Sequence, residues 1–197
     1  MARQPNVLLI VADDMSYGDF GRFGDGGPRT PTLDRLIDEG LCLTQHYSGS
    51  PVCSPARAAL LTGRYPHRTG AITPQEVIGL DRIHPREVTL GDCFQHAGYR
   101  TGLIGKWHNG ALDDRFHPNR RGFDEFVGFR GGWMDYWSWW IERGTRGHQS
   151  ARQTNDGRYL TDVFTEEALA FVRRHRANPI YAHTLLQRPT LPAAGAG

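Results

Sequence analysis

The sequence lacks several features that would assign a class of protein at once. No apolar run approaches the 20 or so residues that span a bilayer, so no membrane segment is predicted. The net charge is only +2, which favours neither nucleic acid nor a membrane surface as a partner. The three cysteines are widely spaced and odd in number, so they indicate neither a zinc site nor a disulfide framework.

A targeting signal is also missing from the sequence as written. Residues 1–6 are polar and lead directly into an apolar run, without the regions of a signal peptide. The chain is therefore expected in the cytoplasm, or in the periplasm or outside the cell if a leader precedes it. With 39% hydrophobic and 22% charged residues over 197 positions, the composition is typical of a globular domain.

The pattern of apolar runs and amphipathic stretches predicts an α/β fold. Residues 7–12 are a continuous apolar run, typical of a parallel-sheet strand that is buried on both faces. Further strands are expected at 41–47, 99–104 and 180–186, and helices at 30–40, 55–62, 87–98 and 159–176. Residues 143–158 are expected to form a surface loop. The predicted fold class is a mostly parallel sheet flanked by helices.

Two carboxylates follow the first predicted strand. Asp13 and Asp14 lie where open α/β sheets bind ligands, beyond the carboxyl end of a strand. Adjacent carboxylates repel each other unless a cation or hydrogen-bond donors neutralise them, and oxygen ligands suit Ca²⁺ or Mg²⁺ better than zinc. The alternative is that one of the two caps the following turn.

Cys53 lies at the predicted start of a helix, with Ser54 as the expected N-cap and Gly63 as the expected end. Free backbone N–H groups and the helix dipole favour an anion at this position and lower the pKa of a thiol. Arg57 adds a permanent positive charge one turn further on. The alternative is that Cys53 is simply a small buried apolar side chain.

A lysine and a histidine follow the strand predicted at 99–104. Lys106 and His108 are two residues apart, so in an extended chain they share one face at the carboxyl end of the strand. A lysine can hold an anionic ester oxygen, and a histidine can transfer a proton. The alternative is a solvated lysine and a structural histidine.

An aromatic cluster follows these motifs. It allows two interpretations, packing in the core or the wall of a substrate pocket that stacks on an aryl or sugar ring. Its members are Trp133, Tyr136, Trp137, Trp139 and Trp140.

Taken in order, these motifs resemble those of the type I, formylglycine-dependent sulfatases of the alkaline phosphatase superfamily. The stretch from Cys53 to Arg57 matches C-x-P-x-R, and the stretch from Gly105 to Gly110 matches G-K-W-H-x-G, with Asn109 where the family usually has Leu. The segment from Ala12 to Asp19 resembles the one that supplies two metal ligands. The resemblance implies an alkaline phosphatase-like fold and arylsulfatase-like hydrolysis of a small-molecule or saccharide sulfate monoester.

The same resemblance implies roles for individual residues. Cys53 would be oxidised to Cα-formylglycine by a formylglycine-generating enzyme, and Arg57 would stabilise the modified residue. Asp13, Asp14 and residue 53 would bind Ca²⁺, with Mg²⁺ as the alternative. Lys106 would hold the sulfate, and His108 would act on the second hydroxyl of the hydrated aldehyde or on the ester.

The resemblance covers only part of the family's usual length. We expect residues 1–186 to be the N-terminal part of a sulfatase domain, truncated before its C-terminal part, and residues 187–197 to be a divergent, irregular tail. Thr190 stands where the family has a histidine, and the later metal-binding Asp-Asn pair is absent. The alternatives are a phosphonate monoester or phosphodiester hydrolase of the same superfamily and a catalytically inactive fragment.

Overall fold

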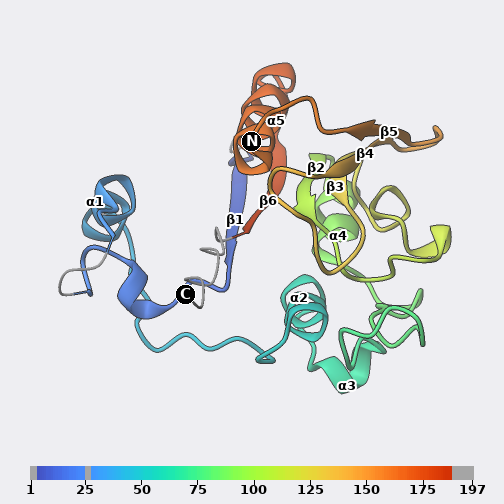
Figure 1. The fold of residues 1–197 in the computed structure, drawn as a ribbon, viewed down its shortest axis with the longest axis horizontal. Coiled ribbons are helices and arrows are strands. Elements are labelled where there is room, and N and C mark those ends of the chain that lie inside the picture. Colours follow the sequence, from blue (N-terminus) through green and yellow to red (C-terminus); the bar gives the residue numbers. More distant parts are fainter. Residues whose placement is uncertain (1–3, 25–27, 188–197) are drawn as a thin grey trace, which may run out of the picture.

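The computed structural model describes residues 4–24 and 28–187, which contain one six-stranded sheet (Figure 1). The sheet order is β1-β6-β2-β3-β4-β5. The strands are β1 (Val7–Asp13), β2 (Arg100–Lys106), β3 (Glu125–Phe129), β4 (Trp140–Thr145), β5 (Ala151–Thr154) and β6 (Ile180–Gln187). The first four in sheet order are parallel and the last two antiparallel. The expectation of a mostly parallel α/β sheet is confirmed.

Five α-helices accompany the sheet in the described residues. They are α1 (Pro31–Glu39), α2 (Cys53–Thr62), α3 (Pro66–Thr69), α4 (Leu90–His96) and α5 (Leu160–Arg174). Short 3-10 turns occur at Tyr17–Asp19, Asp114–Phe116 and Pro118–Arg120. Figure 1 shows α1 well apart from the sheet, joined to α2 by a long extended segment, and no residue of α1 is buried.

The central strands are covered on both faces. On one face, Ile104, Val127 and Ala182 pack with Phe164 and Phe171 of α5. The opposite face carries a second cluster around α2 and α4, formed by side chains that alternate with those of the first. Its buried members are Ala58, Leu61, Ala71, Ile83, Tyr99, Leu103, Trp107, Phe123, Phe126 and Tyr181.

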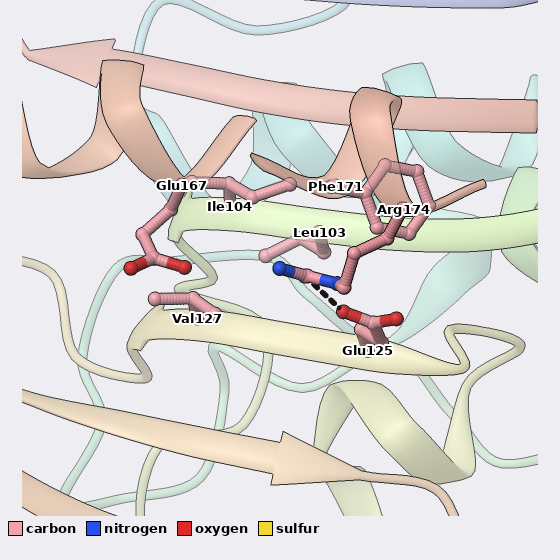
Figure 2. Close-up of a pocket in the computed structure, with 7 residues that line it drawn as sticks. All are labelled: Leu103, Ile104, Glu125, Val127, Glu167, Phe171 and Arg174. Carbon is pink, nitrogen blue, oxygen red and sulfur yellow. Dashed lines mark hydrogen bonds and ion pairs between the residues drawn. The ribbon is translucent and has the colours of Figure 1, made fainter. Parts of the chain in front are cut away.

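A small pocket lies in the layer between the sheet and α5 (Figure 2). Arg174 donates to Glu125 across it at 2.6 Å, and its lining also includes Leu103, Ile104, Val127, Glu167 and Phe171. Glu125 begins β3, so this pocket is close to the amino end of that strand. None of the residues expected to do chemistry lines it.

The expectation that residues 7–12 are buried on both faces is wrong. Among the described residues, β1 is the edge strand and pairs only with β6, through a parallel register of Val7 with Tyr181. Val7 and Leu9 pack against the cluster beside α2, but Leu8 and Ile10 on the other face are 55% and 56% exposed. An apolar run identifies a strand here without identifying its neighbours.

Two segments between the motifs also differ from expectation. Residues 41–47 form no strand, and Leu41, Leu43 and Tyr47 are exposed, because no neighbouring strand is there to pair with them. Residues 143–158 do not form a loop but contribute to the antiparallel hairpin of β4 and β5, where Glu142 pairs with Arg152. Gly147 between the two strands has a φ of 84°, which suits glycine at a tight turn.

The helix ends differ in detail from the expected ones. α2 begins at Cys53 with Val52 as its N-cap, because the hydroxyl of Ser54 donates to the carbonyl of Asp81 at 2.9 Å and does not cap the helix. Gly63 ends the helix as predicted, in the left-handed conformation at φ 66°.

The last helix and the chain end complete the description. The N-cap of α5 is Tyr159. No helix in the described ranges combines the length and apolar character needed to cross a bilayer. Of the tail expected at 187–197, the structure describes only Gln187, which is the last residue of β6. The rest of the tail, with Thr190, lies outside the described residues.

Candidate active site

The carboxyl ends of the parallel strands bring Asp13 and Lys106 together. Asp13 ends β1 and Lys106 ends β2, and β6 lies between these strands in the sheet. The ammonium Nζ of Lys106 donates to Oδ2 of Asp13 at 3.0 Å, so the long side chain bridges the width of one strand. Lys106 is 3% exposed at its side chain and is the single lysine of the chain.

Arg57 joins this pair from α2. Its Nη2 donates to the same Oδ2 of Asp13 at 3.1 Å, and its Nη1 donates to the carbonyl of Lys106 at 3.1 Å. The guanidinium is buried, and its Nε has no partner in the described structure. Two buried cations therefore share a single carboxylate oxygen.

The charges around Asp13 set its protonation. Burial raises the pKa of the carboxyl, but Arg57 and Lys106 outweigh that effect and hold it below its usual value. Burial lowers the pKa of Arg57, and the negative charges of Asp13, Cys53 and Asp14 oppose the change. Cys53 and Asp14 thus lie within electrostatic reach of the guanidinium.

Cys53 is the first residue of α2, as expected for a side chain at a helix start. It is partly exposed and in no disulfide, so reagents can reach it. Its neighbour Ser54 is fully buried and held by Asp81, which fixes the first turn of the helix below it.

Two residues expected to do chemistry have an unusual backbone. Asp14 and His108 have φ values of 56° and 50°, and within the described ranges they are the non-glycine residues with positive φ. Asp and His are among the residues that adopt this conformation most often, and such positions concentrate at functional sites. Asp14 is exposed directly beside Asp13.

His108 lies beyond the end of β2, in the left-handed backbone conformation, so it does not continue the strand that ends at Lys106. Its Nε2 is 3.1 Å from the carbonyl oxygen of Pro74, and the side chain is 4% exposed. Burial lowers the pKa of His108, the Pro74 contact and Glu76 oppose that effect, and the positive charges of Lys106 and Arg57 add to it. The two side chains are near neighbours with different partners.

The residues present supply only part of a cation site. Asp13 and Asp14 offer oxygen ligands that suit Ca²⁺ or Mg²⁺, but one oxygen of Asp13 already accepts from two cations. The described residues hold no cluster of three or more His, Cys, Asp or Glu side chains suited to a metal ion.

Asp81 is an organising residue that the sequence did not single out. It is fully buried, and its Oδ2 accepts from the backbone N–H groups of Gly110 and Ala111 at 3.0 and 3.2 Å. Its carbonyl accepts from Ser54. One residue thus ties the helix of Cys53 to the loop that follows His108. No periodicity marks it, because its role depends on the path of an irregular loop.

The aromatic cluster divides between core and surface. Trp139 is buried in the core, and Tyr136 and Trp140 pack against it. Trp133 and Trp137 are 75% and 64% exposed. Burial raises the pKa of Tyr136 to about 12, and the charges of Tyr159, Asp13 and Asp14 add to that effect, so Tyr136 lies close enough to the paired carboxylates to feel their charge.

Comparison with known proteins gives a consistent result. A family model described as Sulfatase matches residues 5–189. The chain is 38% identical over 196 residues to N-acetylgalactosamine-6-sulfatase of Canis lupus familiaris, covering 88% of this chain and 37% of that protein. It is 47% identical over 137 residues to steryl-sulfatase of Mus musculus, covering 64% of this chain and 22% of that protein.

The fold comparison agrees. The structure of Ps i-CgsB in complex with k-i-k-neocarrahexaose matches with a TM-score of 0.80 and 29% identity, over 96% of this chain and 46% of that one. The chain thus spans less than half the length of these relatives. Since the family model covers nearly all of the sequence, the chain belongs to the sulfatase family.

Proposed function

We propose that this chain is the part of a sulfate monoester hydrolase that contains the nucleophilic residue. The observation that supports this most is the sharing of Asp13 by two buried cations, Arg57 and Lys106, beside a partly exposed Cys53. A sulfate ester is a permanent anion, and preplaced cations in a water-poor site stabilise the charge that builds up as it is cleaved.

Cys53 is proposed to act in its Cα-formylglycine form. A separate formylglycine-generating enzyme would replace the thiol by an aldehyde, releasing sulfide, with molecular oxygen as oxidant and thiols as co-reductant. One hydroxyl of the hydrated aldehyde attacks sulfur, the S–O bond to the alcohol breaks, and the alcohol leaves with a proton, so that sulfate is covalently held on residue 53. Deprotonation of the second hydroxyl then re-forms the aldehyde and expels sulfate. A serine or an unmodified thiol has no such second group, which is the reason for the modification.

The neighbouring residues then have distinct tasks. Arg57 orients residue 53 from the next turn of the same helix and stabilises negative charge on it. Lys106 holds a sulfuryl oxygen, and His108 accepts a proton from the second hydroxyl or hydrogen-bonds to the bound ester. Asp13 keeps both cations in place, because it accepts from each of them.

A divalent cation, Ca²⁺ or alternatively Mg²⁺, is proposed to bind Asp13, Asp14 and residue 53 together with ligands from the remainder of a longer chain. Such an ion would add positive charge beside the sulfate.

For the substrate, we propose a sulfate ester on a ring. The exposed Trp137 contacts Tyr159 in a tilted arrangement, with ring centroids 5.2 Å apart, and Tyr136 stacks on the same ring. We propose that this aromatic surface adjoins the site and contacts an aryl or sugar ring, because, besides burial, the charges of Asp13 and Asp14 are among the causes that raise the pKa of Tyr136. The names of the relatives include a steryl and an amino-sugar sulfatase.

Mass spectrometry of the peptide spanning Cys53 tests the modification. After coexpression with a formylglycine-generating enzyme, the peptide should lose about 18 Da, since SH and H are replaced by a carbonyl oxygen. The product should hydrolyse 4-nitrophenyl sulfate faster than an aryl phosphonate ester. Cys53→Ser should abolish turnover, and Cys42→Ala, at another exposed cysteine, should leave it unchanged. An unmodified peptide, or preference for the phosphonate, would contradict the proposal.

A further inference from the structure

The loop that precedes α4 reaches the imidazole of His108. Nε2 of His108 lies 3.1 Å from the carbonyl oxygen of Pro74. A carbonyl oxygen can only accept, so Nε2 must carry the hydrogen. In the neutral ring, Nδ1 then bears the lone pair, and this atom is buried without a partner in the described structure. The turn at Pro74 therefore selects one tautomer of His108.

Glu76, two residues further on, contacts both the histidine and a second loop. Its Oε1 lies 3.7 Å from Nε2 of His108 and accepts from the backbone N–H of Gly132 at 2.5 Å. Gly132 lies against the imidazole so closely that an added Cβ would be 2.5 Å from Cε1 of His108. The carboxylate thus holds the backbone at Gly132 on the ring.

The charges that act on His108 come from three elements. Lys106 at the end of β2 and Arg57 in α2 disfavour a proton on the imidazole, and burial acts in the same direction. Glu76 is the acidic side chain that opposes them. Without it, a buried histidine would face two cations with no carboxylate beside its N–H group.

We propose that Glu76 is a positioning residue for His108. By accepting from the backbone N–H of Gly132, it holds the Pro74 turn and the Gly132 loop against the ring, so that the Pro74 carbonyl keeps the Nε2–H tautomer and Nδ1 remains the free acceptor. The relevance of this arrangement to catalysis rests on the proposed sulfatase function. The arrangement itself does not, and the two can be tested apart.

The test uses Glu76→Gln and Glu76→Ala with Glu39→Gln as control. Gln keeps an oxygen for Gly132 but loses the charge, whereas Ala loses both. Glu39 is exposed at the end of α1, so its substitution makes the same charge change far from the imidazole. The first readout is the tautomer and pKa of His108, measured by NMR of the imidazole nitrogens as a function of pH.

We expect Glu76→Gln to lower the pKa of His108 by about 1 unit, as loss of one nearby opposite charge does. Glu76→Ala should also mix the two tautomers. In the formylglycine-bearing protein, the acidic limb of kcat/KM for 4-nitrophenyl sulfate should move to lower pH in Glu76→Gln. In Glu76→Ala, kcat should fall about tenfold, with KM changed less than twofold.

The outcomes separate the two ideas. If the folded variants keep the tautomer and pKa of the parent, the positioning role is overturned, whatever the activity. If both change as expected but no sulfate ester is turned over by the parent, the positioning role stands and the proposed function fails. Dispersed amide spectra verify that each variant is folded. If Glu76→Ala does not fold, the near-isosteric Glu76→Gln variant alone tests the positioning role.

Discussion

At the scale of single residues, Asp13 decides whether the site holds together. It is the shared acceptor of Arg57 and Lys106, and its side chain is 18% exposed. Removing one partner of a buried ion pair strands the other charge in a poorly solvated place, which costs more than the pair contributes when intact.

Asp13→Asn is therefore expected to lower the free energy of unfolding by about 3 kcal/mol, measured by urea denaturation at neutral pH. The matched control is Asp14→Asn. It changes the charge of the adjacent, exposed carboxylate and should alter stability by less than about 0.5 kcal/mol. Equal effects of the two substitutions would show that the shared ion pairs contribute nothing to stability.

The sequence allowed the meeting of Asp13 and Lys106 at one edge of the sheet to be predicted, but not the residues that support them. Asp13 and Lys106 follow apolar strands, and a parallel sheet brings such ends to one edge. Glu76 and Asp81 lie in an irregular loop, where contacts depend on the path of the chain and leave no periodic pattern. The helix start at Cys53 was predicted, although Ser54 proved to bind Asp81 instead of capping it.

At the scale of elements, the loop after β2 depends on Asp81. Its carboxylate accepts from the N–H groups of Gly110 and Ala111 in a fully buried place. Asp81→Ala leaves both donors unpaired and is expected to lower the free energy of unfolding by about 2–6 kcal/mol, since each unsatisfied buried group costs about 1–3 kcal/mol.

Asp81→Asn is the control for that prediction, because its amide oxygen can still accept from the loop. It should lose less stability than the alanine variant. The amide proton shifts of residues 110 and 111 should move upfield in Asp81→Ala and remain close to the parent values in Asp81→Asn. If the alanine variant is as stable as the parent, the loop does not depend on this carboxylate.

Elements with strong periodicity were predictable and those without it were not. β2 and β6 are apolar runs between turn signals, and α5 repeats its apolar residues at helical spacing, so all three were expected. β4 and β5 form a polar hairpin at the sheet edge, rich in Arg, Glu and Gln, whose composition resembles that of a loop. Residues 41–47 show the opposite error, since apolar composition does not make a strand without a partner.

At the scale of the whole molecule, a buried histidine links stability to pH. His183 lies on β6, and its Nδ1 is hydrogen-bonded to the hydroxyl of Tyr181 at 3.0 Å. Burial, with a contribution from the charge of Arg57, lowers the pKa of His183 to about 3 from 6.5. Between these values the unfolded chain binds a proton that the folded chain does not, so stability falls as the pH falls.

We expect this residue to remove about 1.4 kcal/mol of stability for each pH unit below 6.5, or about 2 kcal/mol between pH 7 and pH 5. In His183→Gln, unfolding free energies measured at these two pH values should differ by about that much less than in the parent. His46→Gln, at an exposed histidine, should keep the parental slope. An unchanged slope in His183→Gln would mean that the imidazole takes up its proton equally readily in the folded and unfolded chains, so that its pKa is not lowered by folding.

The ion pair between Lys106 and Asp13 also holds the edge strand β1 to the rest of the sheet. β1 has a single hydrogen-bonded neighbour, and its last residue is anchored by charges that belong to β2 and α2. Protonation of Asp13 at low pH would loosen the end of β1 and, at the same time, separate Asp13 from Arg57 and Lys106 in the proposed active site. The order of this edge strand and the ability of the proposed site to bind an anionic substrate therefore both depend on the protonation state of Asp13.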